Sequence, residues 1–220
     1  MYTLFFAPGT CSLASHIALE ESGLPFTAQR VDFAKNEQRS PAFLQLNPKG
    51  RVPALRTPDG ILTETLAILA FIAQTAPERQ LAPLDPPFAF AQMQAFNTFL
   101  AATVHVAHAH GRRGSRWADA PASLADMKAK VPHTMGENFA LIEHGMLQGP
   151  WVLGERYSVA DPYLFTMAGW LESDGVEIAR FPKVHDHFRR MHERPAVQRA
   201  LATEQASATA ALMPKTMNTV

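Results

Sequence analysis

One cysteine lies where a helix is expected to begin. Cys11 follows a short apolar run that ends at Pro8-Gly9, and residues with helical spacing come directly after it. Backbone N–H groups and the helix dipole favour an anion at such a position, so a thiolate is stabilised there. The dipole alone lowers a thiol pKa by less than about one unit, so a reactive Cys11 also needs a cation or hydrogen bonds from Ser12 and the backbone. The alternative is a small buried residue that packs the first helical turn.

A proline interrupts an apolar run that otherwise reads as a strand. Pro53 lies within Asn47–Leu55, and proline cannot donate a hydrogen bond to a strand ladder. A cis Val52-Pro53 bond would turn the chain and leave the backbone groups of Val52 free to pair with a peptide ligand. A trans proline on an edge strand is the alternative.

Two polar residues precede a strongly apolar helical segment. Glu64 and Thr65 follow Leu62-Thr63 and stand at the expected start of that helix. They either cap the helix or receive the ammonium and the carboxylate of a ligand, respectively.

A second helix start carries Ser158 and, three residues later, Asp161. This spacing resembles a capping box with Asp in place of Glu. We therefore interpret Asp161 as part of a folding signal rather than as a catalytic acid.

Nine histidines raise the question of a metal site. On one helix His105 and His108 share a face, whereas His110 points away from them, so three ligands do not converge. We expect no metal, and we expect His105 and His108 to lie in the wall of a cleft.

The elements that must position these residues divide the chain into two parts. Residues 1–76 alternate strand and helix signals in the order βαβ, short helix, ββα, which predicts an α/β domain. Four prolines in residues 77–87 predict a linker, and the helical spacing from Phe88 onward predicts an all-helical domain over 88–220.

Composition excludes several classes of partner. Lys plus Arg and Asp plus Glu each count 20 in 220 residues, so we expect neither a nucleic acid nor an anionic membrane as partner. The longest apolar run, Leu66–Ala73, is far shorter than a membrane span. A single cysteine and no secretory pattern at the start favour a cytoplasmic protein.

These segments in this order resemble the glutathione transferase superfamily, and the match is closest to its bacterial beta class. The hallmark of that class is a cysteine just before the first helix, here Cys11. The resemblance implies a thioredoxin-like domain, a linker and a helical domain. It rests on five segments: Ala7–Glu20, Asn47–Leu55, Leu62–Ile68, Ser158–Phe165 and Arg194–Leu201.

The resemblance also implies roles for individual residues, with glutathione as co-substrate. Cys11, assisted by Ser12, would act on the glutathione sulfur, and Lys35 would reach the glycine carboxylate. Val52, before a cis Pro53, would pair with the cysteinyl backbone. The γ-glutamyl end would be held by Glu64 and Thr65, and His105 would line the cleft from the second domain.

The chain departs from the class at two positions. Phe6 stands where the class often has a tyrosine, and Val106 where a lysine often follows the cleft histidine. We expect the second substrate to meet Phe6, His105, His108, Arg112 and Trp117. The cations of this segment indicate a polar or anionic co-substrate.

We therefore expect a homodimeric glutathione transferase that activates the glutathione thiol for attack on a hydrophobic electrophile. Two alternatives remain open at this point. One is a glutathione-dependent thiol-disulfide oxidoreductase that uses Cys11 as its nucleophile, and the other is a non-catalytic glutathione-binding module.

Overall fold

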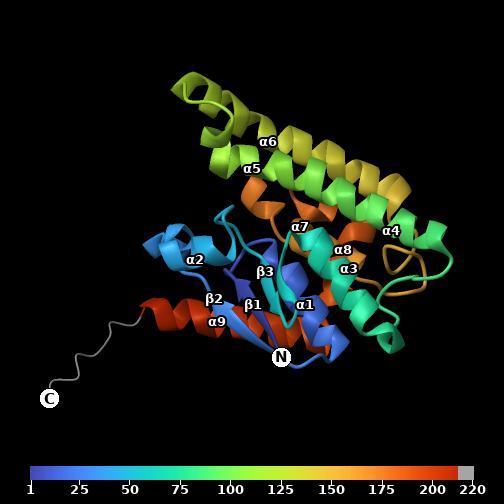
Figure 1. Cartoon of the computed structure of the whole chain (residues 1–220). Helices are drawn as coiled ribbons and strands as arrows, with labels where there is room; N and C mark the ends of the chain where they lie inside the picture. Colours follow the sequence, from blue (N-terminus) through green and yellow to red (C-terminus); the bar gives the residue numbers. More distant parts are fainter. Residues whose placement is uncertain (213–220) are drawn as a thin grey trace, which may run out of the picture.

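The first part of the chain forms a mixed four-stranded sheet. The computed structural model describes residues 1–212 (Figure 1). Strands β1 (Tyr2–Phe6) and β2 (Phe26–Arg30) run parallel, whereas β3 (Ala54–Thr57) runs antiparallel to β1 and pairs with β4 (Gly60–Thr63). The strand order is β2-β1-β3-β4, so β1 is central and its last three residues are buried.

Side chains of β1 alternate between the two faces of the sheet, as a pleated strand requires. Leu4 and Phe6 join the main core, which helices α1 (Ser12–Ser22) and α3 (Thr65–Thr75) help to build. Phe5 points the other way and packs against Phe43 of the short helix α2 (Pro41–Leu46). The sheet therefore lies between α1 and α3 on one face and α2 on the other. The turns at one end of the sheet are not covered by these helices and line a cleft.

The second part is helical. Helix α4 (Pro87–Phe99) passes through one π turn (Leu100–Val104) into α5 (His105–Arg113), which lies beside α6 (Pro121–Leu141) in Figure 1. Three further helices follow: α7 (Ala160–Ala168), α8 (Pro182–His192) and α9 (Pro195–Leu212).

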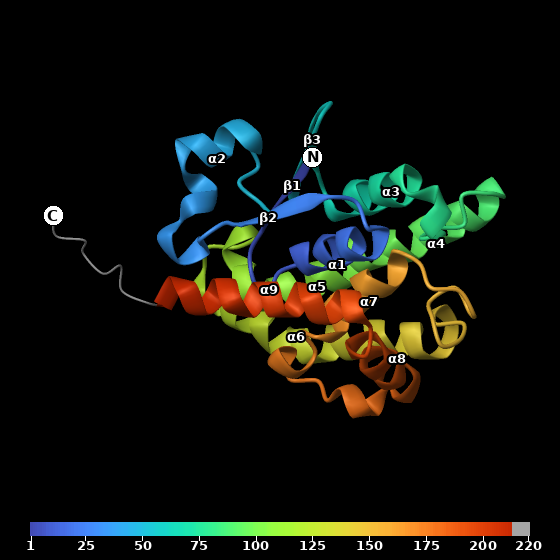
Figure 2. The ribbon, with the colours of Figure 1, turned by 90° about the horizontal axis from the view of Figure 1, so that it is seen from below.

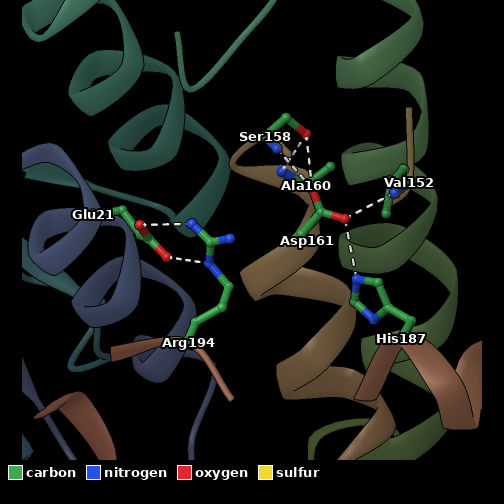
Figure 3. A network of polar contacts seen from close by, with 7 residues as sticks. All are labelled: Glu21, Val152, Ser158, Ala160, Asp161, His187 and Arg194. Atoms are coloured by element: carbon green, nitrogen blue, oxygen red, sulfur yellow. Dashed lines mark hydrogen bonds and ion pairs between the residues drawn. The ribbon is translucent and has the colours of Figure 1, made fainter. Parts of the chain in front are cut away.

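Asp161 is the centre of a buried network at the start of α7 (Figure 3). Its carboxylate accepts hydrogen bonds from the Ser158 N–H at 2.7 Å and the Val152 N–H at 2.8 Å, and it lies 3.0 Å from His187 Nε2. The Ser158 hydroxyl in turn accepts from the Ala160 N–H at 3.2 Å. These bonds confirm the predicted folding role of Asp161, which is fully buried and does not face the cleft.

The last helix returns to the first one. Figure 2 shows α9 running along α1, and Arg194 and Arg199 pair with Glu21 and Glu20 of α1, each at 2.6 Å. Between the helices a buried apolar cluster joins α1 to later elements. Its members are Leu13, Ile17, Phe165, Met191, Val197 and Ala200.

The predicted fold class is confirmed, with strands and helices in the expected order in the first part and helices in the second. The Val52-Pro53 bond is cis, so the trans alternative is wrong. Within residues 1–212, no helix combines the length and the apolar character that crossing a bilayer requires.

Candidate functional site

A cleft of about 980 Å³ separates the turns of the sheet from the helical part. Both parts of the chain contribute to its walls. The lining includes Gly9, Thr10, Cys11, Arg39, Arg51, Val52, Pro53, Glu64 and Thr65 from the first part, and His105, His108, Arg112, Arg113, Arg116, Trp117, Tyr163 and Trp170 from the second.

Cys11 lies at the N-terminal end of α1 and is partly exposed to this cleft. Its Sγ donates a hydrogen bond to the Val52 carbonyl at 3.6 Å. Burial raises the pKa of the Cys11 thiol above its ordinary value, against the smaller lowering effects of the Thr65 hydroxyl and the Arg113 charge. In the free protein this balance favours the protonated thiol, because the effect of burial exceeds those of the hydroxyl and the charge.

The turn that carries Cys11 is held by two residues of the helical part. Gly9 adopts a positive φ of 70°. Its N–H donates to Glu204 Oε2 at 3.1 Å, and its carbonyl accepts from Trp170 Nε1 at 3.3 Å. The N–H and the carbonyl of Gly9 are thus both hydrogen-bonded, the first to a side chain of α9 and the second to Trp170, which follows α7.

Ser12 does not reach the cleft, which corrects its expected catalytic role. It is fully buried, and its hydroxyl lies 3.2 Å from both the N–H and the carbonyl of Ala7. The hydroxyl of Thr10 approaches it to 2.8 Å. Ser12 therefore closes the turn before α1 and has no free group to offer a ligand.

Phe6 also lies away from the cleft. It is 1% exposed, belongs to the main core and packs against the ring of His16 at 5.3 Å. The pleat of β1 turns it inward, so the expectation that it meets the second substrate is wrong.

Glu64 and Thr65 stand where the sequence predicts, at the start of α3. Glu64 precedes the helix with a φ of 73°, and its carboxylate is exposed and paired with Lys49 Nζ. Thr65 is buried and lies beside the Cys11 thiol. The Glu64 carboxylate is exposed and already binds the ammonium group of Lys49. A ligand's ammonium group could therefore take the place of Lys49.

Lys35 is not among the residues that line the cleft. Its side chain is 73% exposed, and its Nζ pairs with Asp32 at 3.3 Å. The short helical turn at Phe33–Lys35 presents Phe33 to the cleft instead. The expected contact of Lys35 with a carboxylate of glutathione therefore has no support in the geometry.

His105 and His108 form one wall of the cleft together with Trp170. The His108 ring stacks on Trp170 with centroids 4.1 Å apart, and its Nδ1 lies 2.8 Å from Asp174 Oδ2. Burial, with a smaller contribution from nearby cations such as Arg113, lowers the pKa of His105 to about 4. His105 is therefore neutral at pH 7.

Five arginines surround the cleft: Arg39 and Arg51 on the sheet side, and Arg112, Arg113 and Arg116 on the helical side. Burial lowers the pKa of Arg116, and the charges of Arg113, Arg51 and Arg39 act in the same direction. Sequence reasoning singled out Arg112 and missed Arg39, Arg51 and Trp170, although Arg51 stands directly before the Val52-Pro53 pair that could have indicated it.

Of the expected site residues, the structure thus brings together Cys11, Val52, Pro53, Glu64, Thr65, His105, His108, Arg112 and Trp117. It leaves Ser12, Phe6 and Lys35 outside. In the described part of the chain, no three His, Cys, Asp or Glu side chains gather in a way that could hold a metal ion.

Two sequence families match the chain. The glutathione S-transferase N-terminal domain matches residues 1–74, and the glutathione S-transferase C-terminal domain matches residues 134–190. Among curated proteins, the chain is 34% identical over 204 residues to the glutathione S-transferase GstA of Escherichia coli O157:H7, covering 91% of this chain and 98% of that protein.

Solved structures agree in fold. A glutathione transferase homolog from Sulfitobacter with bound glutathione is 50% identical with a TM-score of 0.89, covering 94% of this chain and 98% of that one. The bacterial beta class glutathione S-transferase of Sphingomonas chungbukensis is 34% identical with a TM-score of 0.81, covering 92% and 98%. Sequence, fold and cleft together show that this chain belongs to the glutathione S-transferase family.

Proposed function

We propose that the cleft binds glutathione along the Cys11 turn and the start of α3 and conjugates it to a small electrophile that enters beside α5. One observation carries this proposal: the thiol of Cys11 donates to the carbonyl of Val52 in a cleft that Thr65 also lines.

Binding uses the two ends of a tripeptide. Glu64 takes the γ-glutamyl ammonium in place of Lys49, and the start of α3 at Thr65 receives the adjacent carboxylate. The backbone of Val52 pairs with the cysteinyl residue next to Pro53, and His105 lines the opposite wall. Arg39 and Arg51 line the cleft whereas Lys35 does not, which supports them as the cations for the glycine carboxylate.

Activation uses Cys11 as a neutral donor. Because burial keeps its thiol protonated, Cys11 can turn its S–H from the Val52 carbonyl toward the glutathione sulfur. Such a hydrogen bond favours the glutathione thiolate over the thiol, and the charge of Arg113 acts in the same direction. The thiolate forms the new C–S bond, the leaving group departs with its electron pair, and the thiol proton passes to solvent.

The same observation disfavours thiol-disulfide exchange at Cys11. That reaction needs a thiolate as the attacking group, and a raised pKa reduces the thiolate fraction at neutral pH. Conjugation needs only the hydrogen of the Cys11 thiol, so the geometry supports it better.

The homodimer and the cytoplasmic location are further proposals. The family resemblance supports a dimer, and the single cysteine is typical of a reducing compartment. Sedimentation of dilute protein at the mass of one 24.2 kDa chain would contradict the dimer.

A column of immobilised glutathione and two activity assays test the proposal. We expect retention on the column and conjugation of 1-chloro-2,4-dinitrobenzene, and we expect the Cys11→Ala variant to bind glutathione but to conjugate more slowly. Disulfide reduction that is fast and disappears in Cys11→Ala, with no conjugation by the parent protein, would replace this function by the oxidoreductase alternative.

A further inference from the structure

The cleft is lined by more arginine side chains than glutathione has anionic groups to pair with. Its five arginines make no ion pair with any acidic side chain in the described part of the chain. Elsewhere Arg30, Arg189, Arg190, Arg194 and Arg199 each pair with a carboxylate, whereas Arg56, Arg79, Arg156 and Arg180 do not, so the cleft is distinguished by the gathering of five such arginines in one place. Glu64, the acidic residue of the lining, is already paired with Lys49, and Asp174 behind the wall is bonded to His108.

The anionic groups of bound glutathione account for only part of this charge. Glutathione brings two carboxylates and, when activated, a thiolate. In the proposed binding mode the start of α3 receives one carboxylate and Arg39 and Arg51 meet the other, while the charge of Arg113 acts on the Cys11 thiol. Arg112 and Arg116 are then left without an anion, on the wall that the second substrate must approach.

An exposed aromatic ring lines the cleft together with these two arginines. Trp117 follows Arg116 directly, is 48% exposed, and rests edge-on against His110 with centroids 4.5 Å apart. A flat apolar body can pack on Trp117 while an attached anion meets the guanidinium groups beside it. An uncharged hydrophobic electrophile would cover these exposed guanidinium groups without offering them an anion.

We propose that the preferred electrophile of this enzyme carries a carboxylate next to its reacting apolar part and that Arg112 and Arg116 determine this preference. The inference rests on the proposed conjugation and narrows its substrate class. Fixed cations also attract a charged substrate into the cleft before contact, so the preference should weaken as salt screens the charges.

Two matched substrates test the proposal, 4-chloro-3,5-dinitrobenzoate and its methyl ester. In both, the glutathione thiolate forms a C–S bond at the chlorinated carbon, chloride leaves with the bonding electrons, and the thiol proton goes to solvent. After division by the uncatalysed rates, we expect kcat/KM to be about tenfold higher for the carboxylate than for the ester. The ratio should fall toward one in the Arg112→Gln/Arg116→Gln double variant and at high salt.

Arg79→Gln is the matched control, because Arg79 is exposed and lies outside the cleft. It should keep the ratio of the parent protein. Equal or slower turnover of the carboxylate, with the ester and 1-chloro-2,4-dinitrobenzene both conjugated, would overturn this inference and leave the transferase intact. No conjugation of any of the three substrates would overturn the proposed function and the inference with it.

Discussion

Gly9 and Glu204 are joined by a hydrogen bond across 195 positions of the chain, from the Gly9 N–H to Oε2 of Glu204 at 3.1 Å. Glu204 is 6% exposed, and in the described residues its second carboxylate oxygen has no hydrogen-bond partner. Burial raises the pKa of Glu204 to about 7, while the Gly9 N–H lowers it by a smaller amount. An ionisable group of the last helix therefore supports the turn that carries Cys11.

Glu204 should make stability depend on pH in a defined direction. Its folded-state pKa of about 7 lies above the ordinary value of 4.5, so the folded protein binds the proton more tightly than the unfolded chain. The resulting stabilisation is complete below about pH 4.5 and is lost as the pH rises through about 7. This loss lowers the free energy of unfolding by about 3 kcal/mol at most. In Glu204→Gln this loss should be absent, as measured by urea unfolding at several pH values. Glu155→Gln, at an exposed carboxylate, serves as the control, and equal pH slopes in both variants would contradict the prediction.

The Cys11 thiol should ionise above the pH at which free cysteine does, because burial raises its pKa. The rate of alkylation by iodoacetamide, followed against pH beside free cysteine, measures this. Thr65→Val removes the hydroxyl that lowers the pKa and should move the midpoint further up, whereas Thr65→Ser should keep it. Bound glutathione should slow the alkylation. A midpoint below that of free cysteine would contradict this prediction and favour a reactive Cys11 thiolate.

Glutathione affinity should depend on Glu64 and hardly on Lys35. Glu64→Gln removes the partner proposed for the γ-glutamyl ammonium and should weaken binding by about tenfold. Lys35→Ala removes an exposed cation paired with Asp32 outside the cleft and should change Kd by less than about twofold. Isothermal titration calorimetry gives both values. A larger loss in Lys35→Ala than in Glu64→Gln would show that the glycine end is misplaced.

Asp161 should be among the residues on which stability depends most. Asp161→Ala would leave the N–H groups of Val152 and Ser158 and the ring of His187 without their acceptor in a fully buried site. We expect a loss of about 3–5 kcal/mol in the free energy of unfolding, measured with urea. Asp126→Ala, at an exposed position of α6, should change it by less than about 0.5 kcal/mol. Similar losses in the two variants would contradict the role of the network.

Local patterns in the sequence predict the elements and the capping network well. The apolar run of β1, the Gly23 stop of α1 and the Ser158–Asp161 spacing each act within a few residues, and the structure has each of them. The same holds for Cys11, Glu64 and Thr65, because each stands at a helix start that its neighbours determine.

The corrected residues depend on packing that no local pattern contains. Phe6 faces the core because of the pleat of β1, and Ser12 is buried because its hydroxyl closes the turn on Ala7. The raised pKa of Cys11 follows from the elements that cover it. His108 and Asp174 are 66 residues apart, and only the folded chain brings them together.

The contact of α9 with α1 has a consequence for synthesis on the ribosome. Leu13 and Ile17 are made early, but their apolar partners Phe165, Met191 and Val197 are translated more than a hundred residues later. Until then the nascent sheet exposes an apolar helix face that invites aggregation or a chaperone. The hydrogen bond from Gly9 to Glu204 likewise cannot form while Glu204 is inside the exit tunnel, so the Cys11 turn acquires this support late.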